Sequence, residues 1–178
     1  MCKILVALVA AMCLVYGRYC YESNAEEPLM YVQVLNSPVP NARSFKSWMP
    51  YTAITSHNSG QWRMQQIAYT CEDGFRRIDG LYMIALGTYF LSHYGVGDVF
   101  EITLSEGRIF RAVVGDVKAN RHTDATNRFT AHNGCMLEFI VCRPNMPEMA
   151  RRMGDISFAG FEGYVVNMVR LHELFIVV

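Results

Sequence analysis

Short apolar runs separated by polar turns make up most of the chain after residue 80. The runs that are rich in β-branched and aromatic residues are Leu81 to Leu86, Val99 to Leu104, Ile109 to Val114, Met136 to Val141 and Tyr164 to Leu171. Such runs are typical of β-strands, and Ser105-Glu106-Gly107 joins two of them as a tight hairpin loop. Short strands at this spacing, with few helices, predict an all-β domain built as a barrel or a sandwich.

Three segments depart from this pattern. Trp62 to Tyr69 has mixed periodicity that fits a helix or a strand, and Pro147 to Met153 predicts a single helical turn. Residues 119–133 read ANRHTDATNRFTAHN and are almost wholly polar. A loop of this length in a compact domain is usually functional or mobile, although a solvated surface excursion is an equal alternative.

The N-terminus has the pattern of a targeting segment. Lys3 precedes an unbroken apolar run of twelve residues from Ile4 to Val15. That is too short for a transmembrane helix, which takes about twenty residues, but it fits the core of a secretory signal. We therefore expect a signal peptide or signal anchor over 1–18, a linker over 19–43 and the folded domain over 44–178. A buried N-terminal strand or helix is the alternative.

Composition fits a folded domain and argues against nucleic acid as a partner. Apolar residues make up 52% of the 178 residues and charged residues 18%, which is too apolar for a disordered chain. The formal net charge is +0 and no basic run occurs. Bulk electrostatics therefore favour no nucleic-acid partner.

The six cysteines give no metal or redox motif. They are Cys2, Cys13, Cys20, Cys71, Cys135 and Cys142, and no Cys-x-x-Cys occurs. Cys135 and Cys142 flank one predicted strand and would lie roughly 23 Å apart, too far to bridge each other. Disulfides to Cys71 or Cys20 and buried free thiols both remain open.

Three carboxylates lie at the ends or in the middle of the predicted strands. Asp79 and Asp116 lie at strand ends, and Glu138 lies inside the run MLEFIV. If such a group lines a cleft, desolvation raises its pKa and makes it a candidate general acid. For each one alone, a cap, a turn or a solvated face is the plainer interpretation.

Nearby groups offer competing interpretations of these acids. Cationic residues that could pair with them and hold them ionised are Arg111, Lys118, Arg121 and Arg128. His122, Asp124 and His132 together suggest a metal-dependent hydrolase, but their spacing matches no standard metal motif. We therefore expect no metal and no cofactor.

The stretch from Asp79 to Val141 resembles the three-aspartate (3D) domain of wall-active proteins. The likeness rests on IALGT at Ile84 to Thr88, on Gly115-Asp116 after an apolar strand, and on a later strand with a central acid. The resemblance implies a small double-psi β-barrel with few short helices, as in rare-lipoprotein-A-like proteins and expansins. The wider sequence is also similar to uncharacterised exported proteins of Firmicutes and their mobile elements or phages.

The resemblance assigns Asp79, Asp116 and Glu138 to the family's three acids. It implies a secreted or extracytoplasmic lytic transglycosylase, in which Asp116 protonates the glycosidic oxygen of peptidoglycan glycan strands. Asp116 would then act as base while the muramic C6 hydroxyl attacks C1, giving a 1,6-anhydro product. Asp79 and Glu138 would position sugar hydroxyls or stabilise positive charge on the sugar.

Further residues are expected at the same site, and one feature favours a second function. We expect Thr88, Lys118 and Asp124 to contact the substrate. The chain departs from the family motif at Ala85, in place of proline, and at Val117-Lys118, in place of Thr-Gly. These departures favour a non-catalytic barrel module of a phage, mobile element or cell envelope that binds wall or a protein partner. If the leader stays uncleaved, the N-terminus contacts the membrane.

Overall fold

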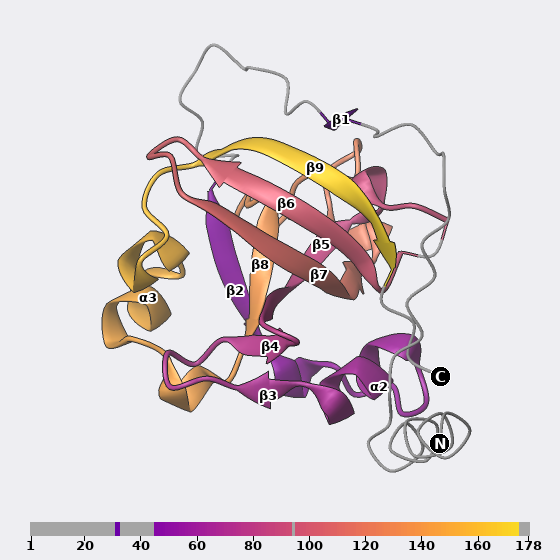
Figure 1. Cartoon of the computed structure of the whole chain (residues 1–178), viewed down its shortest axis with the longest axis horizontal. Helices are drawn as coiled ribbons and strands as arrows, with labels where there is room; N and C mark the ends of the chain where they lie inside the picture. Colours follow the sequence, from indigo (N-terminus) through magenta and orange to yellow (C-terminus); the bar gives the residue numbers. More distant parts are fainter. Residues whose placement is uncertain (1–30, 33–44, 94, 175–178) are drawn as a thin grey trace, which may run out of the picture.

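The computed structural model describes residues 31–32, 45–93 and 95–174 (Figure 1). The expected signal segment 1–18 lies outside these residues, as does the expected linker apart from Tyr31 and Val32. No helix within the described ranges is long and apolar enough to cross a membrane.

One mixed sheet of nine strands forms the body of the described chain. Its strands are β1 (Tyr31–Val32), β2 (Lys46–Pro50), β3 (Tyr69–Thr70), β4 (Arg76–Ile78), β5 (Leu81–Gly87), β6 (Asp98–Leu104), β7 (Ile109–Lys118), β8 (Leu137–Val141) and β9 (Val165–Leu174). The α-helices are α2 (Gly60–Ile67) and α3 (Glu148–Met153). Short 3-10 turns are η2 (Tyr51–Ala53), η3 (Thr88–Phe90), η4 (Asn120–His122), η5 (Arg143–Asn145) and η6 (Ile156–Ala159). The prediction of mainly β structure with few short helices is confirmed.

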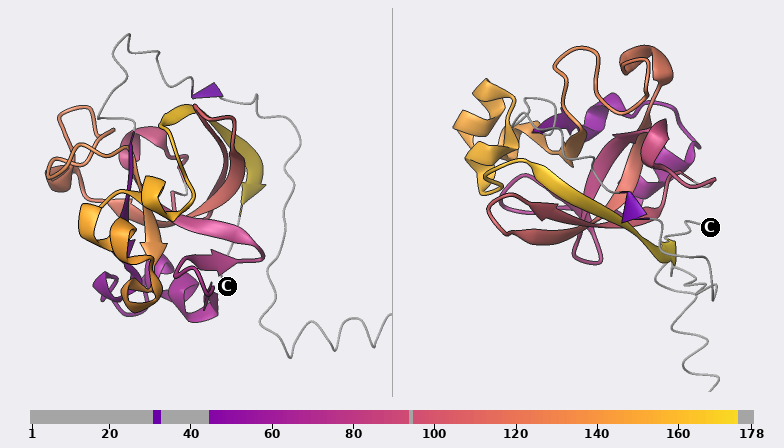
Figure 2. Two further views of the ribbon diagram at one scale, coloured as in Figure 1. Left: turned by 90° about the vertical axis from the view of Figure 1, so that its left-hand side faces the viewer. Right: turned by 90° about the horizontal axis from the view of Figure 1, so that it is seen from above.

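Strand β5 is the centre of the sheet. It pairs in parallel with β7 on one side, and on the other side it is antiparallel to β4 at its start and to β8 towards its end. Beyond β7 the order continues through β6 and β9 to β1, and beyond β8 it ends at β2, which is parallel to β8. The sheet curls strongly, as Figure 2 shows.

The sheet is not closed among the described residues, so the expected closed barrel is not seen. The segment from α3 to η6 lies beside β2 (Figure 1). Side chains of β2 are bonded to this segment: Ser47 Oγ donates to Gly154 O at 2.7 Å, and Trp48 Nε1 donates to Ala150 O at 3.1 Å. These bonds bring helical turns, in place of a further strand, against β2.

The two faces of the sheet pack into different cores. On one face a cluster of aromatic rings meets largely edge to face, and its members are Phe75, Tyr82, Phe110, Phe139 and Phe161. On the other face Met64 of α2 packs with Met83, Val113 and Ile140, all of which are buried. The face that α2 covers also carries the candidate site.

Candidate functional site

Two of the three expected acids lie in one row across the sheet. Ala85 of β5 pairs with Asp116 of β7 on one side and with Glu138 of β8 on the other. Residues that are paired in neighbouring strands point to the same face of a sheet. The carboxylates therefore flank Ala85 on the face covered by α2, with backbones two strand spacings, or about 10 Å, apart.

A β-bulge at Gly115 turns Asp116 towards this face. The register shifts between Ile84, which pairs with Val114, and Ala85, which pairs with Asp116, so Gly115 is the extra residue. A Cβ at Gly115 would lie 2.5 Å from Met83 Cε and 2.9 Å from the Ile140 methyl Cδ1, so glycine leaves the required room. Without the bulge, strand alternation would place Asp116 on the same face as Val114, in the aromatic core.

Burial changes the acidity of Asp116. Desolvation raises the pKa of Asp116 to about 6, although a hydrogen bond with the backbone of Val117 acts in the opposite direction. The charge of Glu138 raises this pKa further and that of Lys118 lowers it. A carboxyl with a pKa near 6 is part protonated under mildly acidic conditions and can act as either proton donor or proton acceptor.

Asp116 lines a small cavity whose other walls come from the segment between η2 and α2. The cavity measures about 230 Å³, and its remaining lining residues are Ala53, Ile54, Thr55, Ser56, Ser59 and Gln61. Pockets that enclose a drug-sized ligand typically measure about 300–1,000 Å³. This one therefore fits a single ring or substituent of a larger ligand, with hydroxyl and amide groups around it.

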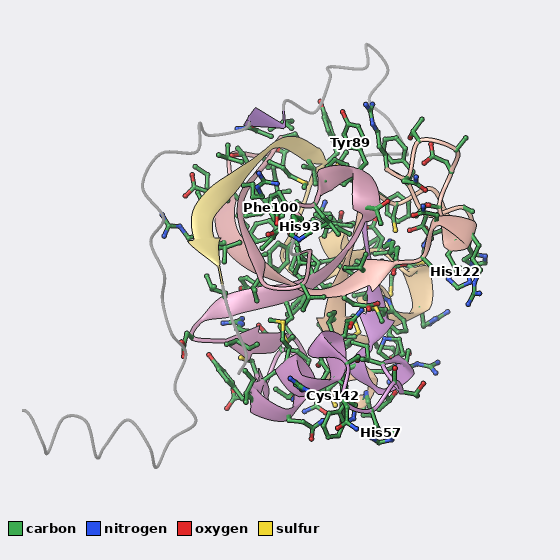
Figure 3. The ribbon with its side chains drawn as sticks, turned by 90° about the vertical axis from the view of Figure 1, so that its right-hand side faces the viewer. His57, Tyr89, His93, Phe100, His122 and Cys142 are labelled. Atoms are coloured by element: carbon green, nitrogen blue, oxygen red, sulfur yellow. The ribbon has the colours of Figure 1, made fainter. Side chains whose placement is uncertain are left out.

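The wall of this cavity is fixed by the start of α2. Ser59 caps the helix, since its Oγ accepts from Trp62 N at 3.1 Å and donates to Ser56 O at 2.7 Å. The rings of His57 and Trp62 lie 5.1 Å apart on the same segment, and Figure 3 shows His57 at this end of the molecule. Capping of this kind stabilises a helix start by about 1 kcal/mol, so the cavity wall is held in place before any ligand binds.

Glu138, the second acid, is ion-paired with Lys118. Lys118 Nζ lies 3.4 Å from Glu138 Oε2, and the two side chains are only 6% and 16% exposed. Lys118 Nζ also donates to Thr130 Oγ1 and lies 3.6 Å from Cys135 Sγ. Burial raises the pKa of Cys135, while Lys118 acts to lower it, so this thiol is a neutral neighbour of the pair rather than a thiolate nucleophile.

The polar segment 119–133 is an ordered cover over the end of β5. Its close approach requires Gly87, where a Cβ would lie 2.0 Å from the Asn127 carbonyl oxygen. Thr88 Oγ1 is hydrogen-bonded to Asn120 Oδ1 at 3.0 Å. Thr88 was expected to bind substrate, and the structure places its hydroxyl against this cover.

Asp124 shapes the same segment. Its Oδ1 accepts from Arg128 N at 3.0 Å and Phe129 N at 3.1 Å, and its Oδ2 accepts from Thr126 Oγ1 at 2.8 Å. Burial acts to raise the pKa of Asp124, but these hydrogen bonds together lower it. The structure therefore gives this carboxylate a role in holding the loop.

The remaining expected acid, Asp79, lies elsewhere. It is exposed in the two-residue turn between β4 and β5, at φ 47°, followed by Gly80 at φ 82°. Asp-Gly is a favoured pair for such a turn. The first residue of β5, Leu81, is already about 13 Å along the strand from Ala85. Asp79 is thus not brought to the row that contains Asp116.

The histidines of the polar loop do not form a metal centre. His122 accepts from Arg121 Nε at 3.3 Å, and both His122 and His132 are exposed. Across the residues that the structure describes, no group of three His, Cys, Asp or Glu side chains could hold a metal ion. The cysteines Cys71, Cys135 and Cys142 are free thiols.

Sequence reasoning missed Ser56, Ser59 and Gln61 as cavity residues and Thr130 and Cys135 as neighbours of the ion pair. The sequence did indicate that Lys118 lies near Asp116. Lys118 follows Asp116 by two residues and therefore lies on the same face of β7. No signal linked residues 53–61 to Asp116, because that contact depends on how α2 packs. No family model matches this chain and no curated protein matches its sequence, so its function is inferred from the site itself.

Proposed function

We propose that this protein is exported and cleaves the glycan strands of peptidoglycan as a lytic transglycosylase, with Asp116 as the acid and base. The observation that carries the proposal is the unequal pair of carboxyls beside Ala85. Asp116 has a raised pKa and lines a cavity, whereas Glu138 is ion-paired with Lys118. Carboxyls whose surroundings differ in this way are typical of acid/base sites.

The reaction follows from these roles. Protonated Asp116 donates its proton to the bridging oxygen as the C1–O bond breaks, and the departing sugar keeps the bonding electron pair. The positive charge that develops on the ring is stabilised by the carboxylate that proton transfer leaves on Asp116, while Glu138, held by Lys118, orients the sugar hydroxyls. Asp116, now a carboxylate, takes the proton of the C6 hydroxyl as O6 attacks C1, which closes the 1,6-anhydro ring and restores the acid.

A single carboxyl is sufficient for this route. Hydrolytic glycosidases need a second carboxyl as nucleophile or as the base for a water molecule. Here the second acid is held by a lysine at 3.4 Å, with little exposure. That arrangement supports the intramolecular closure over hydrolysis.

We propose that the run β2-β8-β5-β7-β6-β9 is an opened relative of the double-psi β-barrel. It is supported by the two parallel pairs, β2 with β8 and β5 with β7, which are separated by an antiparallel pair. Parallel neighbours require crossover connections, and these are the connections expected of such a barrel.

A non-catalytic module that binds wall or an envelope or phage partner is the second candidate. The observation that favours it is the loss of the acid trio, since Asp79 lies in an exposed turn and Glu138 is neutralised by Lys118. A binding module retains affinity for the wall without releasing products.

Digestion of purified peptidoglycan separates the two candidates. The transglycosylase proposal expects 1,6-anhydromuropeptides from the wild type, and loss of them in Asp116→Asn with folding intact. Asp79→Asn is the matched control, because it removes a carboxyl outside the site, and it should keep most of the activity. Wall binding without any soluble product would select the binding module instead. Export is tested by a reporter fused after Val178, which should be active only outside the cytoplasm.

A further inference from the structure

The guanidinium of Arg128 is stacked on an aromatic ring and has no polar partner among the described residues. Its guanidinium lies over the ring of Tyr89, 3.8 Å from the ring centre. Arg128 Nε is buried and makes no hydrogen bond. Among the described residues, no carboxylate forms an ion pair with Arg128. Nε itself is closed to a ligand, so a ligand must bind the terminal Nη groups of this half-buried side chain.

A second arginine, Arg77, has the same kind of stack but also holds a carboxylate. Arg77 also stacks on a tyrosine, lying 4.2 Å from the centre of the Tyr82 ring, and its Nε is likewise buried without a partner. However, Arg77 Nη2 donates to Asp73 Oδ2 at 2.6 Å and to the Tyr82 hydroxyl at 3.0 Å. Arg77 thus holds an internal carboxylate through Nη2, whereas Arg128 has the same kind of stack without that carboxylate.

The loop that carries Arg128, residues 119–133, has no carboxylate available to pair with it. Its only carboxylate, Asp124, is occupied by the N–H groups of Arg128 and Phe129. Arg121 is exposed on the same loop, and Figure 3 shows Tyr89 and His122 on the side of the molecule where this loop projects. The surroundings therefore favour an incoming anion over an internal partner.

We propose that Arg128, held by Tyr89, is a receptor for a carboxylate of the ligand. A guanidinium fixed by stacking presents its fork in a defined plane and binds a carboxylate by two parallel hydrogen bonds. The receptor lies beside the Gly87 end of β5, two residues or about 7 Å along the strand from Ala85. If the proposed function holds, the ligand is the free carboxylate of the peptide that a glycan strand carries, bound while the sugar contacts Asp116.

The direct test is the side-chain NMR signal of Arg128 Nε–H in the ¹⁵N-labelled full chain, titrated with acetate and separately with inorganic phosphate. We expect a saturable shift with acetate at Arg128 and none at Arg77, which already holds Asp73. A missing acetate shift, or a shift with phosphate alone, would overturn the proposal. Tyr89→Phe should keep the shift because it keeps the ring, and Tyr89→Leu should weaken it.

Binding to isolated peptidoglycan then tests the ligand. Arg128→Gln should weaken binding by about tenfold to a hundredfold, as expected for loss of a charge-assisted bidentate contact. Arg121→Gln removes an exposed arginine from the same loop and should change binding by less than about twofold. Equal losses in the two variants would mean non-specific charge attraction and would overturn the receptor. If the acetate shift is present but the wild type neither binds nor cleaves peptidoglycan, the carboxylate receptor is upheld and the proposed function fails.

Discussion

Asp116 and Glu138 lie opposite the same residue, Ala85, from the two strands that flank β5. Their side chains therefore share one face of the sheet although they are 22 positions apart in the sequence. Among the residues that the structure describes, only Glu138 of the two forms an ion pair with a lysine, Lys118. Their surroundings are therefore unequal: Glu138 is ion-paired, whereas desolvation raises the pKa of Asp116.

Replacing Asp116 by asparagine should stabilise the protein at neutral pH. The pKa of Asp116 is raised from 3.8 to about 6 on folding, so its ionised form is disfavoured in the native state. Stability should fall as pH rises from about 4 to about 6, and the penalty above pH 6 is roughly 2–3 kcal/mol. Urea unfolding at pH 7 should show Asp116→Asn to be more stable, with the gain vanishing near pH 4. An equal gain at both pH values would show that the ionisation of Asp116 is not responsible.

Lys46 should make the stability of the protein rise with pH, which is the opposite of the effect of Asp116. Its side chain is fully buried and donates to the Gly163 carbonyl. Burial lowers the pKa of Lys46 to about 8, although Asp155 and Glu162 act to raise it. The unfolded chain then binds more protons than the folded one between pH 8 and 10.5, so stability should rise with pH over that window, by roughly 3 kcal/mol.

Lys46→Met is the variant that isolates this effect. It removes the titrating group but keeps an unbranched side chain of similar length. The difference in unfolding free energy between Lys46→Met and the wild type should shift in favour of the wild type as pH rises from 8 to 10. A difference that stays constant with pH would refute the assignment of a lowered pKa to Lys46.

The Lys118–Glu138 ion pair should show strong coupling in a double-mutant cycle. Lys118→Met leaves a carboxylate nearly buried without its partner, and we expect a loss of about 3 kcal/mol. The double variant with Glu138→Gln should recover at least about 1 kcal/mol, because the unpaired charge is gone. Additive losses would mean that the two side chains do not interact as the 3.4 Å distance indicates.

Gly87→Ala should displace the polar loop from the end of β5. Gly87 has φ −70° and ψ 155°, which any residue adopts, so the cost comes from the clash with the Asn127 carbonyl alone. We expect a loss of about 2–3 kcal/mol and faster amide exchange in residues 119–133. Gly60→Ala is the control, because a Cβ there would meet only Val96, at 3.8 Å, and it should not destabilise.

The sequence predicted most strands but not their partners. All five apolar runs became strands, since alternation and β-branched residues are local properties. That β5 lies between β7 and β8 depends on contacts far apart in the chain, which no local pattern contains. The resemblance grouped Asp116 with Glu138, and the sheet places both beside Ala85. Strict alternation along β7 would have buried Asp116 in the aromatic core. The bulge at Gly115 prevents this. Asp79 has a local explanation as a turn residue that the motif comparison overlooked.

The role of Asp116 is tested most directly by the products of peptidoglycan digestion by the wild type and by Asp116→Asn, measured by mass spectrometry at about pH 5.5. At that pH a carboxyl with a pKa of about 6 is mostly protonated. We expect 1,6-anhydromuropeptides from the wild type and none from a folded Asp116→Asn variant. Equal amounts of product from both proteins, or products with reducing ends in place of the anhydro ring, would contradict this expectation.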